Sequence, residues 1–175
     1  MAIPRLTLVL GGARSGKSRH AEGLVETQAP PWTYVATAEA YDDEMRARIA
    51  LHRERRPAGW ETVDAPLALA AVIRGQAGRP VLVDCLTLWL TNTMLAEGNV
   101  GSAMDDLVTA CRETPGPLVL VSNEVGFGIV PDNALARRFR DHAGVLHQRL
   151  AAHADRVVLM VAGLPLIVKD GPSDA

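Results

Sequence analysis

Residues 11–18 read GGARSGKS, and this short segment restricts the fold more than any other part of the chain. It satisfies the pattern G-x-x-x-x-G-K-[ST], with the apolar run LTLVL before it and a helical pattern, SRHAEGLVE, after it. Glycines between a buried strand and a helix let backbone N–H groups point at phosphate oxygens beside the helix N-terminus. The segment therefore predicts a loop that binds the phosphates of a nucleoside triphosphate.

The residues at the end of this loop have separate expected roles. Lys17 is expected to reach the β- and γ-phosphates, and the Ser18 hydroxyl to ligate Mg²⁺. The run PVLVD places Asp84 at the end of a neighbouring strand, where a carboxylate can join the same metal site. Cys85 follows Asp84 in place of the glutamate typical of hydrolytic motors, and the sequence contains no N-K-x-D guanine-reading motif. A transferase is therefore favoured over a motor ATPase or a signalling GTPase.

Short apolar runs recur along the chain, at residues 6–10, 33–37, 80–86, 117–122 and 156–163. Each run is rich in valine and leucine and is near-continuous, which is typical of parallel strands buried on both faces. Helical patterns separate the runs. We therefore predict an α/β fold, a P-loop NTPase-like (RecA-like), mostly parallel sheet with helices on both faces. A single domain is expected over residues 1–169, with a flexible tail over 170–175.

The composition excludes several classes of function. The chain has 175 residues and a net charge of −2, whereas a general nucleic-acid binder is usually basic. The longest apolar run, at 157–168, is too short to span a membrane. Cys85 and Cys111 lie far apart and match neither a metal-ligand spacing nor a disulfide framework. Together with an N-terminus that lacks a signal-peptide pattern, these features predict a cytoplasmic protein.

Residues 42–57, DDEMRARIALHRERRP, predict a helix that begins with acidic residues, ends with arginines and stops at the proline. Helical spacing places three residues on one face: Met45, Ile49 and His52. Arg48 and Arg55 flank His52 along that face, and Arg53 and Arg56 are displaced around the helix. Burying an imidazole beside cations makes sense if an anion also binds there. Two interpretations of His52 therefore stay open, a satisfied core histidine and a nucleophile toward phosphorus.

The other four histidines are expected to be structural. His20 lies in the helix after the phosphate loop. His142 and His153 are placed near the apolar stripe of a long helix predicted within residues 132–155, and His147 is placed off that stripe. The stripe itself is formed by Leu135, Phe139, Leu146 and Leu150. No histidine pair has a convincing zinc-ligand spacing.

Taken together, five segments resemble the bifunctional adenosylcobinamide kinase/adenosylcobinamide-phosphate guanylyltransferase family of cobalamin biosynthesis. The matching segments are GGARSGKSRHAE (11–22), YVATAEAYDDEMRARIALHRERRPAGWETVDAP (34–66), VLVDCLTLWLTN (81–92), LVSNEVGFGIVPDNALARRFRDHAGVLHQRLA (120–151) and VAGLPLIVK (161–169). They span nearly the whole chain in the family's order. The H-R-x-R-R-P…W segment and N-E-V-G-x-G-I-V-P are more specific than the phosphate loop.

The resemblance implies two reactions. The first phosphorylates the aminopropanol hydroxyl of adenosylcobinamide with GTP or ATP. The second transfers GMP from GTP to that phosphate through a guanylylated histidine, which corresponds to His52, and yields adenosylcobinamide-GDP and pyrophosphate. The implied nucleotide contacts are Gly11, Gly12, Ala13, Arg14, Ser15, Gly16, Lys17, Ser18, Ala36, Thr37, Ala38, Arg53, Glu54, Arg55, Arg56, Asp64 and Asp84. The Mg²⁺ expected from the phosphate loop, with Ser18 and Asp84 as ligands, would bind together with this nucleotide. The assembly that the resemblance implies is a homotrimer.

The segment SNEVGFGIVP at 122–131 follows an apolar run directly and is expected at the carboxyl edge of the sheet, where doubly wound folds bind ligands. We hypothesise that Asn123 and Glu124 line the nucleotide or corrinoid site. Two other functions stay open at this point. One is a P-loop kinase for another small alcohol that forms no histidine intermediate, and the other is a nucleotide-dependent binding switch.

Overall fold

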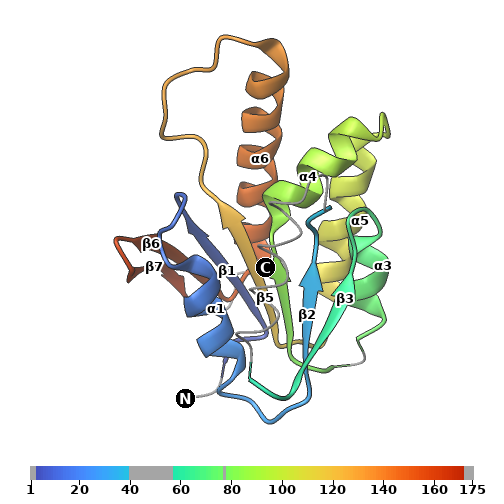
Figure 1. Ribbon diagram of the computed structural model, residues 1–175, viewed down its shortest axis with the longest axis vertical. Helices are drawn as coiled ribbons and strands as arrows, with labels where there is room; N and C mark the ends of the chain where they lie inside the picture. The colour runs from blue at the N-terminus through green and yellow to red at the C-terminus, as the bar shows by residue number, and fades with distance from the viewer. Residues whose placement is uncertain (1–2, 40–56, 77, 172–175) are drawn as a thin grey trace.

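The computed structural model describes residues 3–39, 57–76 and 78–171 (Figure 1). Seven strands form one sheet: β1 (Leu6–Gly11), β2 (Trp32–Ala36), β3 (Trp60–Asp64), β4 (Val81–Asp84), β5 (Leu118–Asn123), β6 (Arg156–Val161) and β7 (Leu164–Asp170). The described helices are α1 (Lys17–Val25), α3 (Leu69–Arg74), α4 (Leu86–Leu95), α5 (Val100–Glu113) and α6 (Ala134–His153).

The strand order in the sheet is β3-β2-β4-β5-β1-β6-β7. All neighbours are parallel except β6 and β7, which are antiparallel. Each of the five apolar runs contains a strand, so the predicted mostly parallel sheet is confirmed. Strand β5 lies between β1 and β4, which brings the ends of these three strands to one edge of the sheet.

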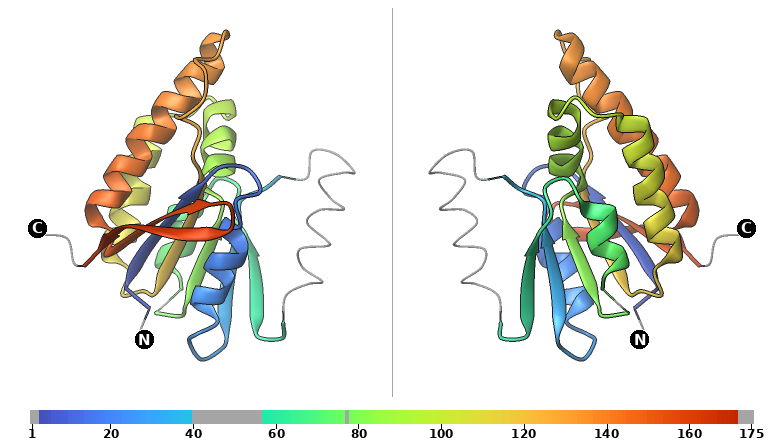
Figure 2. Two further views of the ribbon diagram at one scale, coloured as in Figure 1. Left: turned by 90° about the vertical axis from the view of Figure 1, so that its left-hand side faces the viewer. Right: turned by 90° about the vertical axis from the view of Figure 1, so that its right-hand side faces the viewer.

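The helices cover both faces of the sheet, as predicted (Figure 2). One face packs on α1, through a cluster that includes Ala21 and Val25 of that helix. The opposite face packs on α3, α4, α5 and α6, and its larger cluster includes Trp89, Leu107 and Leu146. Since successive residues of the central strands point to opposite faces, both clusters require apolar side chains, which explains the near-continuous runs.

Two strands were not predicted, β3 and β7. Strand β3 reads WETVD and lies at one edge of the sheet with mostly exposed side chains, so it has no continuous apolar run. Strand β7 begins directly after the predicted strand at 156–163, and the apolar residues 164–168 were not assigned to a strand. The chain reverses at Ala162 and Gly163, whose φ angles are 51° and 82°, and forms a hairpin.

The end of the domain also differs from the prediction. Asp170 was expected to begin a flexible tail, but it is the last residue of β7 and its carboxylate accepts two hydrogen bonds from Arg156, at 2.9 and 2.8 Å. The N–H of Gly171 donates to the carbonyl of Asp155 at 2.9 Å. Residues 170 and 171 are therefore hydrogen-bonded to the start of β6, and residues 172–175 of the expected tail lie outside the described residues.

The two longest described helices begin at asparagine caps. The side chains of Asn99 and Asn133 accept hydrogen bonds from the N–H groups of Ser102 and Ala136 at the starts of α5 and α6. Helix α4 begins at Leu86, inside the run that was predicted to be strand.

Within the described part of the chain, no helix combines the length and the hydropathy needed to cross a membrane.

Candidate phosphate-binding and catalytic site

The glycine-rich loop connects β1 to α1 at the carboxyl end of β1, as its sequence predicted. At Gly11, an added Cβ atom would lie 2.6 Å from the Ser15 hydroxyl oxygen and 2.8 Å from the Met160 carbonyl oxygen. Gly16 is the N-cap of α1 and has a left-handed conformation, with φ 93°. These two glycines let the loop fold tightly over the N-terminus of α1, where backbone N–H groups favour an anion.

Lys17 turns back toward the loop that precedes it. Its Nζ donates a hydrogen bond of 2.6 Å to the carbonyl of Gly12, and the residue is only 7% exposed. Burial lowers the pKa of the Lys17 ammonium, whereas the negative charge of Asp84 opposes this shift. Lys17 therefore lies close enough to Asp84 for their charges to interact. These are two charged residues that the sequence predicted at one site.

Ser15 has a buried hydroxyl that forms no hydrogen bond with any described residue. Its backbone carbonyl accepts from the N–H of Gly163, in the turn between β6 and β7, at 3.1 Å. A buried hydroxyl without a partner is rare and is expected to find one in a ligand. The donor set inside the loop therefore suits a phosphate.

Asp84 ends β4 beside the loop. Its Oδ2 accepts a hydrogen bond of 3.1 Å from the Tyr34 hydroxyl. The Tyr34 ring packs edge-on against Trp60, whose ring centroid is 6.0 Å away, and Trp60 in turn contacts Trp32. The aromatic cluster on β2 and β3 thus orients the Asp84 carboxylate at the edge of the sheet.

The residues after β2 are held by a buried hydrogen-bond network. The Thr37 hydroxyl donates to the Cys85 carbonyl at 2.7 Å and accepts from the Cys85 N–H at 2.9 Å. From α4, the Asn92 amide donates to the carbonyl of Thr37 at 2.8 Å and to that of Pro66 at 3.1 Å. The network fixes the segment Ala36-Thr37-Ala38 next to the end of β4.

Strand register brings three of the predicted contacts to one edge of the sheet. Ala36 is paired with Asp84 on one side and with Asp64 on the other. Asp64 is exposed at the end of the edge strand β3 and lies two strands away from β4. The predicted nucleotide contacts at these positions are therefore aligned, with Asp64 farthest from the phosphate loop.

Strand β5 contributes the residues that follow its apolar run. Asn123 is paired with Gly11, and its amide donates to the Thr87 hydroxyl at 3.0 Å. The N–H of Glu124 donates to the carbonyl of Gly11 at 2.9 Å. The expectation that Asn123 and Glu124 lie at the carboxyl edge of the sheet beside the loop is confirmed.

A cavity of about 430 Å³ opens between the phosphate loop and the β6–β7 hairpin. Its wall is formed by Gly12, Ala13, Arg14, Ser15, Glu124, Phe127, Leu159, Met160, Val161 and Ala162. The cavity combines the anion-binding loop with one carboxylate and an apolar side. A ligand with both phosphate and apolar groups could bind in this cavity, with its phosphates at the loop.

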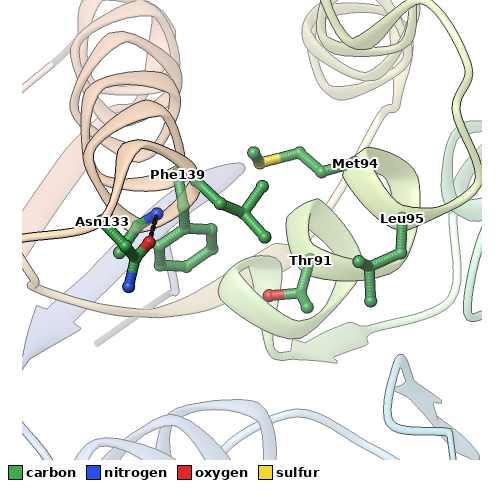
Figure 3. Close-up of a pocket in the computed structure, with 7 residues that line it drawn as sticks. Thr91, Met94, Leu95, Asn133 and Phe139 are labelled. Carbon is green, nitrogen blue, oxygen red and sulfur yellow. Dashed lines mark hydrogen bonds between the residues drawn. The ribbon is translucent and has the colours of Figure 1, made fainter.

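A second cavity, of about 270 Å³, lies between α4 and α6 (Figure 3). Side chains of the two helices face one another across it, and the lining residues are Thr91, Met94, Leu95, Asn133, Leu135, Ala136 and Phe139. None of these residues is charged. Of these two cavities, only the loop cavity is therefore suited to phosphate groups.

His52, which was predicted to be the nucleophile, lies outside the described residues, as do the neighbouring predicted contacts Arg53, Glu54, Arg55 and Arg56. The described ranges contain no cluster of three or more His, Cys, Asp or Glu residues suited to a metal ion. Both cysteines are free and buried, as expected.

One histidine was placed wrongly. His147 was predicted to be off the apolar stripe of the long helix, but it is 7% exposed, whereas His142 and His153 are only partly buried. Residues Ala143, Leu146, His147 and Leu150 are the buried ones on α6. The stripe drawn through Leu and Phe residues missed His147 because that stripe omitted Ala143, which lies one turn before it.

Comparison with known proteins gives the context for this site. A model of the family described as cobinamide kinase / cobinamide phosphate guanyltransferase matches residues 7–168. The chain is 52% identical to the bifunctional adenosylcobalamin biosynthesis protein CobP of Pseudomonas aeruginosa, over 94% of this chain and 98% of that protein. It is 45% identical to the bifunctional adenosylcobalamin biosynthesis protein CobU of Salmonella typhimurium, over 94% of this chain and 99% of that protein.

Solved structures share the fold at low sequence identity. A protein from Pyrococcus horikoshii OT3 is similar with a TM-score of 0.54 and 12% identity, over 97% of this chain and 88% of that chain. The flagellar accessory protein FlaH from Methanocaldococcus jannaschii is similar with a TM-score of 0.50 and 14% identity, over 97% of this chain and 80% of that chain. At such identity these structures support the fold alone. The family match and the near full-length relatives establish more: the chain belongs to the cobinamide kinase / cobinamide phosphate guanyltransferase family.

Proposed function

We propose that this chain phosphorylates the aminopropanol hydroxyl of adenosylcobinamide with GTP or ATP and then transfers GMP from GTP to the resulting phosphate. The products of the second reaction are adenosylcobinamide-GDP and pyrophosphate. The observation that carries the proposal is the phosphate loop, which is folded at the sheet edge with a buried lysine and is surrounded by residues from β2, β4 and β5. Membership of the family supplies the substrates.

The nucleotide phosphates would bind the loop. Backbone N–H groups of residues 11–16 and the Lys17 ammonium would neutralise them, and the unpartnered Ser15 hydroxyl is available to one phosphate oxygen. The network at Thr37 would hold Ala36 and Ala38 for further nucleotide contacts, with Asp64 at the outer end of the same edge.

Mg²⁺ fits the oxygen donors at this edge. A hydroxyl and a carboxylate are the protein ligands that this hard cation prefers, with the remaining positions taken by water and phosphate oxygens. We assign these roles to Ser18 at the start of α1 and Asp84, which Tyr34 orients. When bound, the ion would neutralise charge on the transferred phosphoryl group.

For the second reaction we propose His52 as the residue that accepts GMP, with Arg53, Glu54, Arg55 and Arg56 contributing to GTP binding. A neutral imidazole is a competent nucleophile toward phosphorus, and a covalent phosphoramidate divides one difficult transfer into two easier steps. Arginine side chains beside it would stabilise the charge that develops on the phosphoryl oxygens.

The test is to incubate the protein with GTP labelled at the α-phosphorus and to isolate the protein. We expect acid-labile, alkali-stable label on the wild type and no label on His52→Ala. His142→Ala, which removes a partly buried histidine of α6, is the matched control and should keep the label. A wild type that phosphorylates adenosylcobinamide but never takes up label would favour the kinase without a histidine intermediate, and nucleotide binding without turnover would favour the binding switch.

We also propose that the enzyme works in the cytoplasm as a homotrimer. Two buried, unpaired cysteines are compatible with a reducing compartment. Strand β7 supports a contact between copies, because it is an edge strand and exposes a row of apolar side chains, Leu164, Leu166, Ile167 and Val168.

A further inference from the structure

A buried polar group links α6 to the phosphate loop. It consists of Ser122 near the end of β5, His147 of α6 and Glu124 after β5. The Nε2 atom of His147 is 2.7 Å from the Ser122 hydroxyl oxygen, and its Nδ1 atom is 3.9 Å from Oε2 of Glu124. The first distance is a hydrogen bond, and the second is an electrostatic contact that is longer than a hydrogen bond.

The chemistry of the three groups determines where the proton of the imidazole belongs. Burial lowers the pKa of His147, so the ring is neutral near pH 7 and has one N–H donor and one acceptor. Because an ionised Glu124 can only accept, the tautomer that suits both neighbours has the proton on Nδ1, facing Glu124. The Ser122 hydroxyl then donates to Nε2.

Glu124 is tied to the phosphate loop on its other side. Its backbone N–H donates to the carbonyl of Gly11, and its side chain lines the cavity with Gly12 and Ser15. Its Oε1 accepts from the N–H of Gly126 at 2.5 Å. The carboxylate is therefore held between the buried His147 and the space that phosphates are expected to enter.

A carboxylate at this position is repelled by bound polyphosphate unless a proton or a cation lies between them. Asp84, the other carboxylate beside the loop, has the charge of Lys17 within reach. Among the described residues, no arginine or lysine forms an ion pair with Glu124. Such a carboxylate is suited to accept the proton of a neutral substrate hydroxyl group.

We propose that Glu124 is the proton acceptor for the adenosylcobinamide hydroxyl in the kinase reaction, and that His147 is a positioning residue that orients Glu124. In this step the hydroxyl oxygen forms a bond to the γ-phosphorus, and its proton passes to the Glu124 carboxylate. The bond from the γ-phosphorus to the oxygen that bridges it to the β-phosphate breaks, and the nucleoside diphosphate leaves. The inference rests on the proposed function.

The two proposed reactions differ in the chemistry of their nucleophiles. The nucleophile of the kinase reaction is an alcohol, which loses a proton as it attacks. The proposed guanylyl transfer uses two nucleophiles, the neutral imidazole of His52 and then the phosphate group of the substrate, which is already ionised near neutral pH. Neither is an alcohol that must lose a proton to Glu124. Loss of the proton acceptor should therefore reduce the first reaction far more than the second.

The experiment measures both rates for Glu124→Gln, supplying adenosylcobinamide for the kinase reaction and adenosylcobinamide phosphate for guanylyl transfer. We expect kcat of the kinase reaction to fall about 10²-fold or more, and to fall at least tenfold further than kcat of guanylyl transfer. Glu97→Gln, at an exposed position after α4, is the matched control and should leave the ratio of the two rates unchanged.

The positioning role of His147 is tested with two nearly isosteric variants, His147→Asn and His147→Leu. Both leave Ser122 without its partner, but only asparagine retains an N–H donor near the position of Nδ1. We expect kcat of the kinase reaction to fall by up to about 10²-fold in the leucine variant, with a smaller change in KM, and to recover in part in the asparagine variant. Thermal unfolding of each variant verifies that it is folded.

Three results would overturn the inference. The first is a kinase rate in Glu124→Gln that falls no more than in Glu97→Gln. The second is an equal loss in both reactions, which would make Glu124 a binding or structural residue. The third is an equal loss in the two folded His147 variants, which would remove the positioning role. A wild-type protein that never forms adenosylcobinamide phosphate would instead contradict the proposed function itself, and this inference with it.

Discussion

At the scale of single residues, the phosphate loop depends on the absence of one side chain. Gly11 lies where β1 meets the loop, and an added Cβ atom would lie closer to the Ser15 hydroxyl and to the Met160 carbonyl than packed atoms tolerate. Gly12, the next residue, has no such neighbour within 4 Å. The two adjacent glycines therefore have different tasks, which the motif does not reveal.

We expect Gly11→Ala to lower the free energy of unfolding by about 1–3 kcal/mol, since the added methyl group must displace backbone as well as a side chain. It should also weaken nucleotide binding, because the loop has to open around Ser15. Urea unfolding and a nucleotide titration measure the two effects. In Gly12→Ala the free energy of unfolding should change by less than about 0.5 kcal/mol; equal losses in both variants would refute the packing argument.

The sequence predicted the positions of some site residues and not of others. Gly16 and Lys17 lie at the start of α1, as a motif with a known geometry predicted, and Asp84 ends β4, as the apolar run before it predicted. The burial of His147 was missed because the predicted stripe omitted Ala143. The partners of His147 could not be predicted at all, because Ser122 and Glu124 are 25 and 23 residues away along the chain and become its neighbours only in the folded structure. Such pairing is a property of the tertiary structure and leaves no local pattern.

At the scale of elements, the edge of the sheet is held by hydrogen bonds between segments distant in sequence. Helix α4 fixes the end of β2 through Asn92, whose amide donates to two carbonyls, those of Thr37 and Pro66. The interaction keeps the residues after β2 next to Asp84. The apolar runs predicted the central strands, but they did not predict β3 and β7, which lie at the edges and are not buried on both faces.

We expect Asn92→Ala to lower the free energy of unfolding by about 1–3 kcal/mol, because two carbonyl groups lose a donor in a buried environment. It should also raise KM for the nucleotide, since the segment 36–38 is released. Chemical denaturation measures the first effect and steady-state kinetics the second. Thr109→Ala removes an exposed hydroxyl of α5 and is the control; a comparable loss there would show that the effect does not come from the network.

At the scale of the whole molecule, all of the described chemistry lies at the carboxyl ends of the parallel strands. The loop after β1, Asp84 of β4 and Glu124 after β5 meet there, and the helices bury both faces of the sheet behind them. The alternation of strands and helices predicted this arrangement from sequence, because parallel strands need crossovers and place their ends together. An assembly of several copies has no comparable pattern within one chain, so the proposal of a homotrimer is supported only by the family resemblance and by the exposed apolar strand β7.

The proposal that this chain catalyses both the kinase reaction and the guanylyl transfer is tested most directly by following the products over time. The purified protein is incubated with adenosylcobinamide, GTP and Mg²⁺, and the corrinoids are separated and identified by mass spectrometry. We predict that adenosylcobinamide phosphate forms first and is then converted to adenosylcobinamide-GDP, with release of pyrophosphate. A reaction that ends at adenosylcobinamide phosphate, or that forms no phosphorylated corrinoid, would contradict the proposal.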